Sequence, residues 1–200
     1  MNRVEIKTKA KEIIKGRLWD FWKGYLIFGL VVGVVETLLG FIFTGNLAIV
    51  GTLIASLVTA PLSFGFIYYA MRYARGESLD INDIFKYKKA WIPTFLLTFL
   101  ISLFTTLWML LLIIPGIIAA LSYSMAPYIY CDEEKDAMEC IKASKEMMNG
   151  YKWDYFVFSL SFIGWGILGA FTFGLLYIWL TPYMMTAEVL YYDELKKIRK

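Results

Sequence analysis

The stretch GYLIFGLVVGVVETLLGFIFTGNLAIVGTLIASLVTAPLSFGFIYYAM, residues 24–71, decides the fold of this chain. It contains 48 consecutive residues without a lysine or an arginine. As one helix it would extend about 72 Å, more than twice the roughly 30 Å hydrocarbon core of a bilayer. Two helices joined by a tight turn fit that core, and Thr44-Gly45-Asn46 supplies turn-forming residues near the middle. The stretch therefore predicts a transmembrane helical hairpin.

Two later windows repeat this pattern. No basic residue occurs between Lys89 and Lys135 or between Lys152 and Lys196, and Pro115-Gly116 and Thr172-Phe173-Gly174 mark turns within them. We therefore expect an all-α polytopic membrane protein, a single membrane domain over 1–200 with six transmembrane helices arranged as three hairpins. The expected helices cover 25–44, 47–71, 93–114, 117–131, 155–173 and 175–193.

The composition independently indicates a membrane protein. Apolar residues make up 59% of the chain, against about 45–50% in ordinary soluble domains, and the mean hydropathy is +0.58. A soluble domain of this size would expose large apolar patches. Aromatic residues make up 18%, which excludes a disordered chain. Histidine is absent, so histidine-based catalytic triads, metal sites and haem ligation are excluded.

The basic residues predict the orientation. All 20 lie in four segments: the N-terminal region, 72–91, 132–154 and the C-terminal tail. The three opposite turns have none. Because basic residues are retained on the cytoplasmic side, we expect a multi-pass membrane protein with both termini and both long loops cytoplasmic.

Each hairpin resembles the others. Apolar residues recur at helical spacing in 2–16, 80–89 and 136–149, which predicts an amphipathic cytoplasmic helix before each hairpin. The second helix of each hairpin carries one proline, a potential helix kink: Pro61, Pro127 and Pro182. These features predict a pseudo-threefold repeat with units of about 1–75, 76–131 and 132–195. The alternative is that membrane hairpins resemble one another without true repetition.

Two acidic residues lie inside the apolar windows, Glu36 and Glu188. Glu36 shares one helical face with Gly29, Gly33 and Gly40, and the Gly-x-x-x-Gly spacing allows close helix packing. We therefore expect Glu36 to face another helix, either as a proton or cation site or as a structural hydrogen-bonding group. Glu188 lies near the cytoplasmic end and could extend toward it.

Other apparent motifs indicate no chemistry. Gly164-x-Gly166-x-x-Gly169 lies in an apolar span, where helix packing explains it better than dinucleotide binding. Cys131 and Cys140 have no metal-ligand spacing and are expected to be free thiols. The acidic run at 132–134 is interpreted as a solvated helix start. We expect no catalytic residues, no cofactor, no metal and no nucleic-acid partner.

Several stretches resemble a bacterial integral-membrane family named only as a domain of unknown function (DUF975). The most specific are IIPGIIAALSYSMAPYI (113–129), AMECIKASKEMMNGYKWDYF (137–156), LSFIGWGIL (160–168) and WLTPYMMTAEVLYYDEL (179–195), with PLSFGFIYYAMRYARGE (61–77) also similar. A more distant resemblance is to the membrane domain of bacterial glycerophosphodiester phosphodiesterases, whose catalytic domain has no counterpart here. The resemblance implies a six-helix plasma-membrane protein associated with lipid or envelope metabolism, and it implies no catalytic residues.

Two functions are consistent with these observations. The first is a non-catalytic integral membrane module that binds membrane lipids or a membrane protein partner. The second is a small transporter or channel that uses Glu36.

Overall fold

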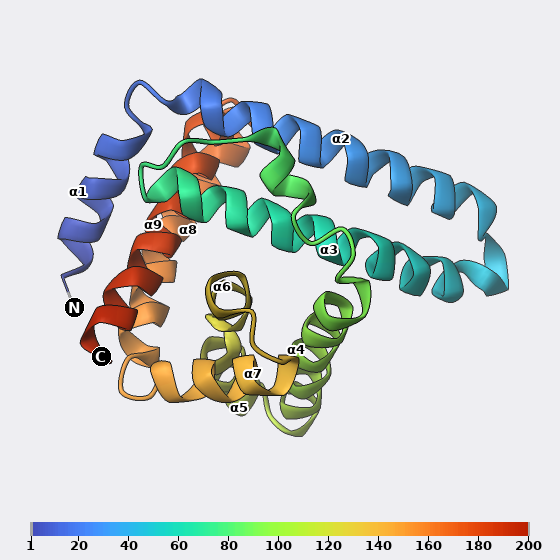
Figure 1. Ribbon diagram of the computed structural model, residues 1–200. Coiled ribbons are helices and arrows are strands. Elements are labelled where there is room, and N and C mark those ends of the chain that lie inside the picture. The colour runs from blue at the N-terminus through green and yellow to red at the C-terminus, as the bar shows by residue number, and fades with distance from the viewer. Residues whose placement is uncertain (1, 200) are drawn as a thin grey trace.

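The computed structural model describes residues 2–199 and is all-helical over them (Figure 1). The elements in chain order are α1 (Arg3–Ile14), α2 (Leu18–Ile42), η1 (Gly45–Leu47), α3 (Ala48–Ala74), η2 (Ile81–Phe85), α4 (Trp91–Leu111), α5 (Ile113–Tyr123), α6 (Ala126–Glu133), α7 (Ala137–Met147), α8 (Lys152–Phe171) and α9 (Tyr177–Ile198). The predicted all-α class is confirmed over this part of the chain.

Five helical segments among the described residues are long and apolar enough to cross a membrane. They are α2, α3, α4, the segment Ile113–Glu133 that joins α5 and α6, and α8. The first 18 residues of α9 include the acids Glu188, Asp193 and Glu194, which lower its apolar character. The helical spans therefore agree with a membrane protein.

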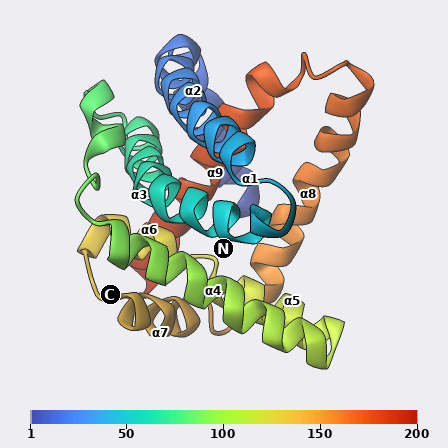
Figure 2. The same ribbon diagram turned by 90° about the vertical axis from the view of Figure 1, so that its right-hand side faces the viewer.

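α3 lies at the centre of the helix packing. α3 packs along α2 and also contacts α4, α6, α9 and η2. The pairs α2–α3, α4–α5 and α8–α9 point in different directions in Figure 2. The turns at Thr44-Gly45-Asn46 and Thr172-Phe173-Gly174 fall between helices as predicted. The second of these turns has positive φ at Phe173 (51°) and at Gly174 (85°).

The helix after α4 begins earlier than predicted. Leu112 is extended (φ −160°, ψ 143°) and forms the turn, so α5 starts at Ile113 rather than at 117. The prediction that Pro115-Gly116 forms this turn is therefore wrong. Pro115 instead occupies the first turn of α5, where its missing N–H removes no helical hydrogen bond.

The three prolines have different effects on their helices. α3 continues through Pro61 and α9 continues through Pro182. Before Pro127 the helix is interrupted, and α6 starts afresh at Ala126. Ser144 of α7 bridges this break: its Oγ accepts from the Met125 N–H (3.2 Å) and donates to the Ser122 carbonyl (2.8 Å). A serine from another helix therefore satisfies backbone groups that the break leaves free.

The amphipathic segments are part of the protein core. Ile6, Ala10 and Ile14 of α1 are buried, and α1 packs on α9, so the two ends of the chain lie close together (Figure 1). α7 likewise buries its apolar face against α4, α5 and α6. These two helices are confirmed by the structure.

The prediction of an amphipathic helix at 80–89 is wrong. This segment forms only the 3₁₀ turn η2, which the Asp80 side chain caps by accepting from the Asn82 N–H. η2 packs against α3 so closely that a Cβ at Gly65 would collide with the Ile84 carbonyl. The segment is therefore packed against α3 and does not lie at the membrane surface as an interfacial helix would.

Candidate functional site

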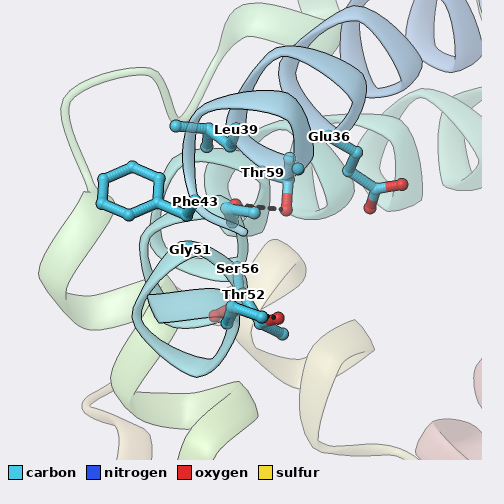
Figure 3. A pocket seen from close by; sticks show the side chains of 10 residues that line it. Glu36, Leu39, Phe43, Gly51, Thr52, Ser56 and Thr59 are labelled. Atoms are coloured by element: carbon cyan, nitrogen blue, oxygen red, sulfur yellow. Dashed lines mark hydrogen bonds between the residues drawn. The ribbon is translucent and has the colours of Figure 1, made fainter. Parts of the chain in front are cut away.

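A groove of about 420 Å³ lies between α2 and α3, close to the turn that joins them. Figure 3 shows Thr59, Ser56 and Thr52 following one another along α3, with Glu36 on the neighbouring α2. The full lining is Glu36, Leu39, Gly40, Phe43, Ala48, Gly51, Thr52, Ala55, Ser56 and Thr59. This groove is the candidate site because it holds the acid that the sequence singles out.

The three hydroxyl groups of the groove are oriented by their own helix. Thr52 Oγ1 donates to the Ala48 carbonyl (3.0 Å), Ser56 Oγ to the Leu53 carbonyl (2.9 Å) and Thr59 Oγ1 to the Ala55 carbonyl (2.9 Å). Each hydroxyl has a single proton, which this bond uses, and two lone pairs. The hydroxyls are therefore available as hydrogen-bond acceptors. The spacing of Thr52, Ser56 and Thr59 places them along one face of a helix. They were not predicted as part of a site, although this spacing is visible in the sequence.

Glu36 has an exposed side chain that lines the groove. Within residues 2–199 it forms no ion pair, and no hydroxyl donates to it. The alternative in which neighbouring hydroxyls clamp this carboxylate is therefore not realised.

The glycine face beside Glu36 does not pack as expected. Nothing lies within 4 Å of a Cβ placed at Gly29, Gly33 or Gly40. The prediction of close Gly-x-x-x-Gly packing on this face is therefore wrong, although Glu36 and Gly40 lie beside α3 in the groove. The close contact between the two helices is made at Gly24, where a Cβ would collide with the Tyr69 ring.

Glu188 lies in a separate environment. The Tyr128 hydroxyl of α6 donates to Glu188 Oε2 (3.0 Å), and the Tyr155 hydroxyl of α8 lies nearby. The Glu188 side chain is thus held by a hydrogen bond from a neighbouring helix. Glu36 and Glu188 share no hydrogen-bond partner, and Glu188 does not line the groove.

A network of charged residues joins the segments that carry the basic residues; we call this region the charged end. Arg75 binds Asp132 (2.9 Å) and Asp193 (2.7 Å), while Lys196 pairs with Asp132 and Glu133. Arg3 of α1 binds Asp154 (3.3 Å) and Lys86 binds Glu134 (3.2 Å). The interpretation of 132–134 as a simply solvated helix start is therefore wrong.

The electrostatics of the charged end favour paired ions. Burial lowers the pKa of Lys196, but the ion pairs with Asp132 and Glu133 raise it more, so the net direction is upward. The pKa of Arg75 is also raised, because its two carboxylate partners outweigh the cost of burial. No sequence pattern predicted these pairs, because their members are as far apart along the chain as Arg75 and Asp193.

The structure agrees with the expectations that the two cysteines are free thiols and that the glycine-rich motif serves helix packing. Cys131 and Cys140 are free and buried, and their Sγ atoms lie near the Phe64 and Lys135 carbonyls. Gly164-x-Gly166-x-x-Gly169 lies within α8. A Cβ at Gly169 would lie 2.7 Å from the Tyr177 ring, which is a helix-packing contact.

Comparison with known protein families identifies the family of this chain. The family model described as "Protein of unknown function (DUF975)" matches residues 1–119 and 108–199. The chain belongs to this family. No curated protein and no solved structure matches it. The more distant resemblance to phosphodiesterase membrane domains stays a prediction.

Proposed function

We propose that this chain is a non-catalytic integral membrane module of the bacterial envelope that binds lipid or a membrane partner protein. One contrast carries the proposal: the charged end is occupied by its own ion pairs, whereas the hairpins expose apolar side chains and the groove. Exposed large apolar residues occur along α2, α4 and α8, for example Leu30 (70%), Leu110 (79%) and Phe171 (78%). Surfaces of this kind fit a lipid environment or another membrane helix.

The proposed topology has six spanning helices, with α9 as the sixth, and the termini and charged segments in the cytoplasm. The ion pairs Arg3–Asp154, Arg75–Asp193 and Lys86–Glu134 support it, because they hold distant parts of the chain at one end. The bacterial plasma membrane and the threefold repeat belong to the same proposal. Labelling of single cysteines in intact cells tests it: either terminus reacting with a membrane-impermeant reagent would contradict it.

Co-purification tests the proposed binding function. The protein would be extracted in mild detergent, and its bound lipids and proteins identified by mass spectrometry against the composition of the source membrane. We expect enrichment of a lipid class or of a membrane protein. A bound lipid profile identical to the membrane, with no enriched protein, would contradict the proposal.

A second candidate function is transport of protons or cations through Glu36. The observation that favours it is the row of hydroxyl acceptors beside the carboxylate. Flux into liposomes would be measured for wild type and Glu36→Gln, with Glu139→Gln on the exposed face of α7 as the control. Loss of flux only in Glu36→Gln is expected if this candidate is correct, and equal flux in all three proteins excludes it.

A further inference from the structure

The chemistry of the groove between α2 and α3 defines the ligand that it can bind. The protons of Thr52, Ser56 and Thr59 are donated to backbone carbonyls, so these side chains offer only lone pairs to the groove. An ionised Glu36 carboxylate is also acceptor-only. A complementary ligand must therefore bring hydrogen-bond donors.

A positively charged ligand would complement the carboxylate of this groove. Glu36 forms no ion pair within residues 2–199, and the surrounding window 24–71 has no lysine or arginine. A carboxylate at membrane depth is costly without a counter-charge. A primary ammonium group meets both requirements, since it is a compact cation with three N–H donors.

The remaining lining indicates an apolar attachment to that ammonium. Leu39, Phe43, Ala48 and Ala55 surround the polar groups, and the volume of about 420 Å³ exceeds what a single ion fills. Cavities of about 300–1,000 Å³ lined mainly by apolar groups, with a few polar ones, are typical of small-molecule sites.

We propose that the α2–α3 groove binds a primary ammonium amphiphile, with the ammonium on Glu36 and the alkyl chain along the remaining lining of the groove. This inference rests on the proposed lipid-binding function and names the chemistry of the ligand. The same ammonium chemistry occurs in a lipid headgroup and in a free alkylamine, and the experiment below separates the two.

The test measures equilibrium binding of radiolabelled dodecylammonium to the protein in phosphatidylglycerol nanodiscs, with empty nanodiscs as background. Glu36→Gln keeps the shape and removes the charge, and should weaken binding by about tenfold or more. Ser56→Leu fills the groove and should weaken binding independently of charge. Glu139→Gln, an equal charge change on the exposed face of α7, should leave the affinity unchanged.

Two results would overturn the proposal. The first is equal dodecylammonium affinity in wild type, Glu36→Gln and Ser56→Leu, all shown to be folded by circular dichroism and size-exclusion chromatography. The second is displacement of the probe by neutral dodecanol as effectively as by unlabelled dodecylammonium. Either result would mean that the probe partitions without recognition of its ammonium.

Phosphatidylethanolamine added to the nanodiscs identifies the source of the ammonium. Competition with the probe supports a lipid headgroup, whereas Glu36-dependent binding without competition supports a free amine. Lipids that co-purify with the same preparations separate this inference from the proposed function. If a lipid is enriched but the probe binds equally well without the Glu36 carboxylate, only the ammonium site is refuted. If probe binding depends on Glu36 but no lipid or protein is enriched, only the general function is refuted.

Discussion

Within the described part of the chain, polar groups are paired at the charged end but unpaired in the half of α2 that lies nearest the α2–α3 turn. At the charged end, Arg75 binds two carboxylates from two other helices, and Lys196 joins the same network. In the first hairpin, Glu36 has no partner within residues 2–199, and open space lies beside Gly29 and Gly33. The charged residues of the charged end thus stabilise the fold through ion pairs, whereas Glu36 of the first hairpin is accessible to a group from outside the chain.

The physical reason is the cost of an unpaired ion. A partly buried charge that loses its partner is strongly destabilising, so the charges at the charged end are held in pairs. A membrane-embedded acid has the same need. Because the chain itself provides no cation for Glu36, that need must be met by a proton or by a group from outside the chain.

The largest expected effect is at Arg75. Arg75→Ala leaves Asp132 and Asp193 without this partner, and we expect the free energy of unfolding to fall by about 2–4 kcal/mol. Unfolding in mixed micelles with increasing dodecyl sulfate measures it. Lys197→Ala is the matched control, because Lys197 forms an exposed pair with Glu194 whose loss should cost less than about 1 kcal/mol. Equal losses in the two variants would show that the network is not stabilising.

A second prediction concerns the reactivity of Cys140, which is buried in α7. Burial raises its pKa to about 11, against about 8.5 for a free cysteine. At pH 8 its alkylation should therefore be about a hundredfold slower than that of a cysteine introduced at the exposed position Met138 on the same helix. Site-resolved mass spectrometry measures both rates.

The pH dependence of Cys140 has a definite sign. Because the folded pKa is raised, the neutral thiol stabilises the fold below pH about 8.5, and this contribution is lost as the pH rises toward about 11. The alkylation rate should rise steadily over that interval. A plateau near pH 9 would contradict the buried position.

Glycines in the two regions should respond differently to alanine. At Gly65 a Cβ collides with the Ile84 backbone carbonyl, so Gly65→Ala should destabilise the protein by about 1–3 kcal/mol. At Gly33 nothing lies within 4 Å, so Gly33→Ala should be neutral or stabilising by up to about 1 kcal/mol. The same unfolding titration measures both. A similar loss at Gly33 would mean that its face is already packed against something.

The smallest effect is expected at Glu36 itself. Glu36→Leu removes an unpartnered acid from an apolar region, so the stability in ligand-free micelles should stay within about 1 kcal/mol of wild type or increase. Unfolding midpoints with and without dodecylammonium measure it. A loss of more than about 2 kcal/mol without ligand would show a structural role for the carboxylate.

Much of the fold follows from the sequence, because membrane insertion depends on local composition. The windows free of lysine and arginine predicted the all-helical class, and the turns at 44–46 and 172–174 lie between helices as predicted. α1 and α7 were also predictable, since apolar residues at helical spacing require a surface to cover them. The helices that cover them were not predictable from the sequence: α9 packs against α1, and α4, α5 and α6 pack against α7.

The sequence by itself determined the all-helical class, the positions of most of the long helices and which acid lacks a cation within its own window, because these depend on residues close together along the chain. Only the tertiary structure decided which face of α2 is covered, that Asp132 pairs with Arg75 and Lys196, and that Glu188 meets Tyr128. These contacts join residues separated by more than forty positions, and they depend on how whole helices pack, which no local pattern encodes.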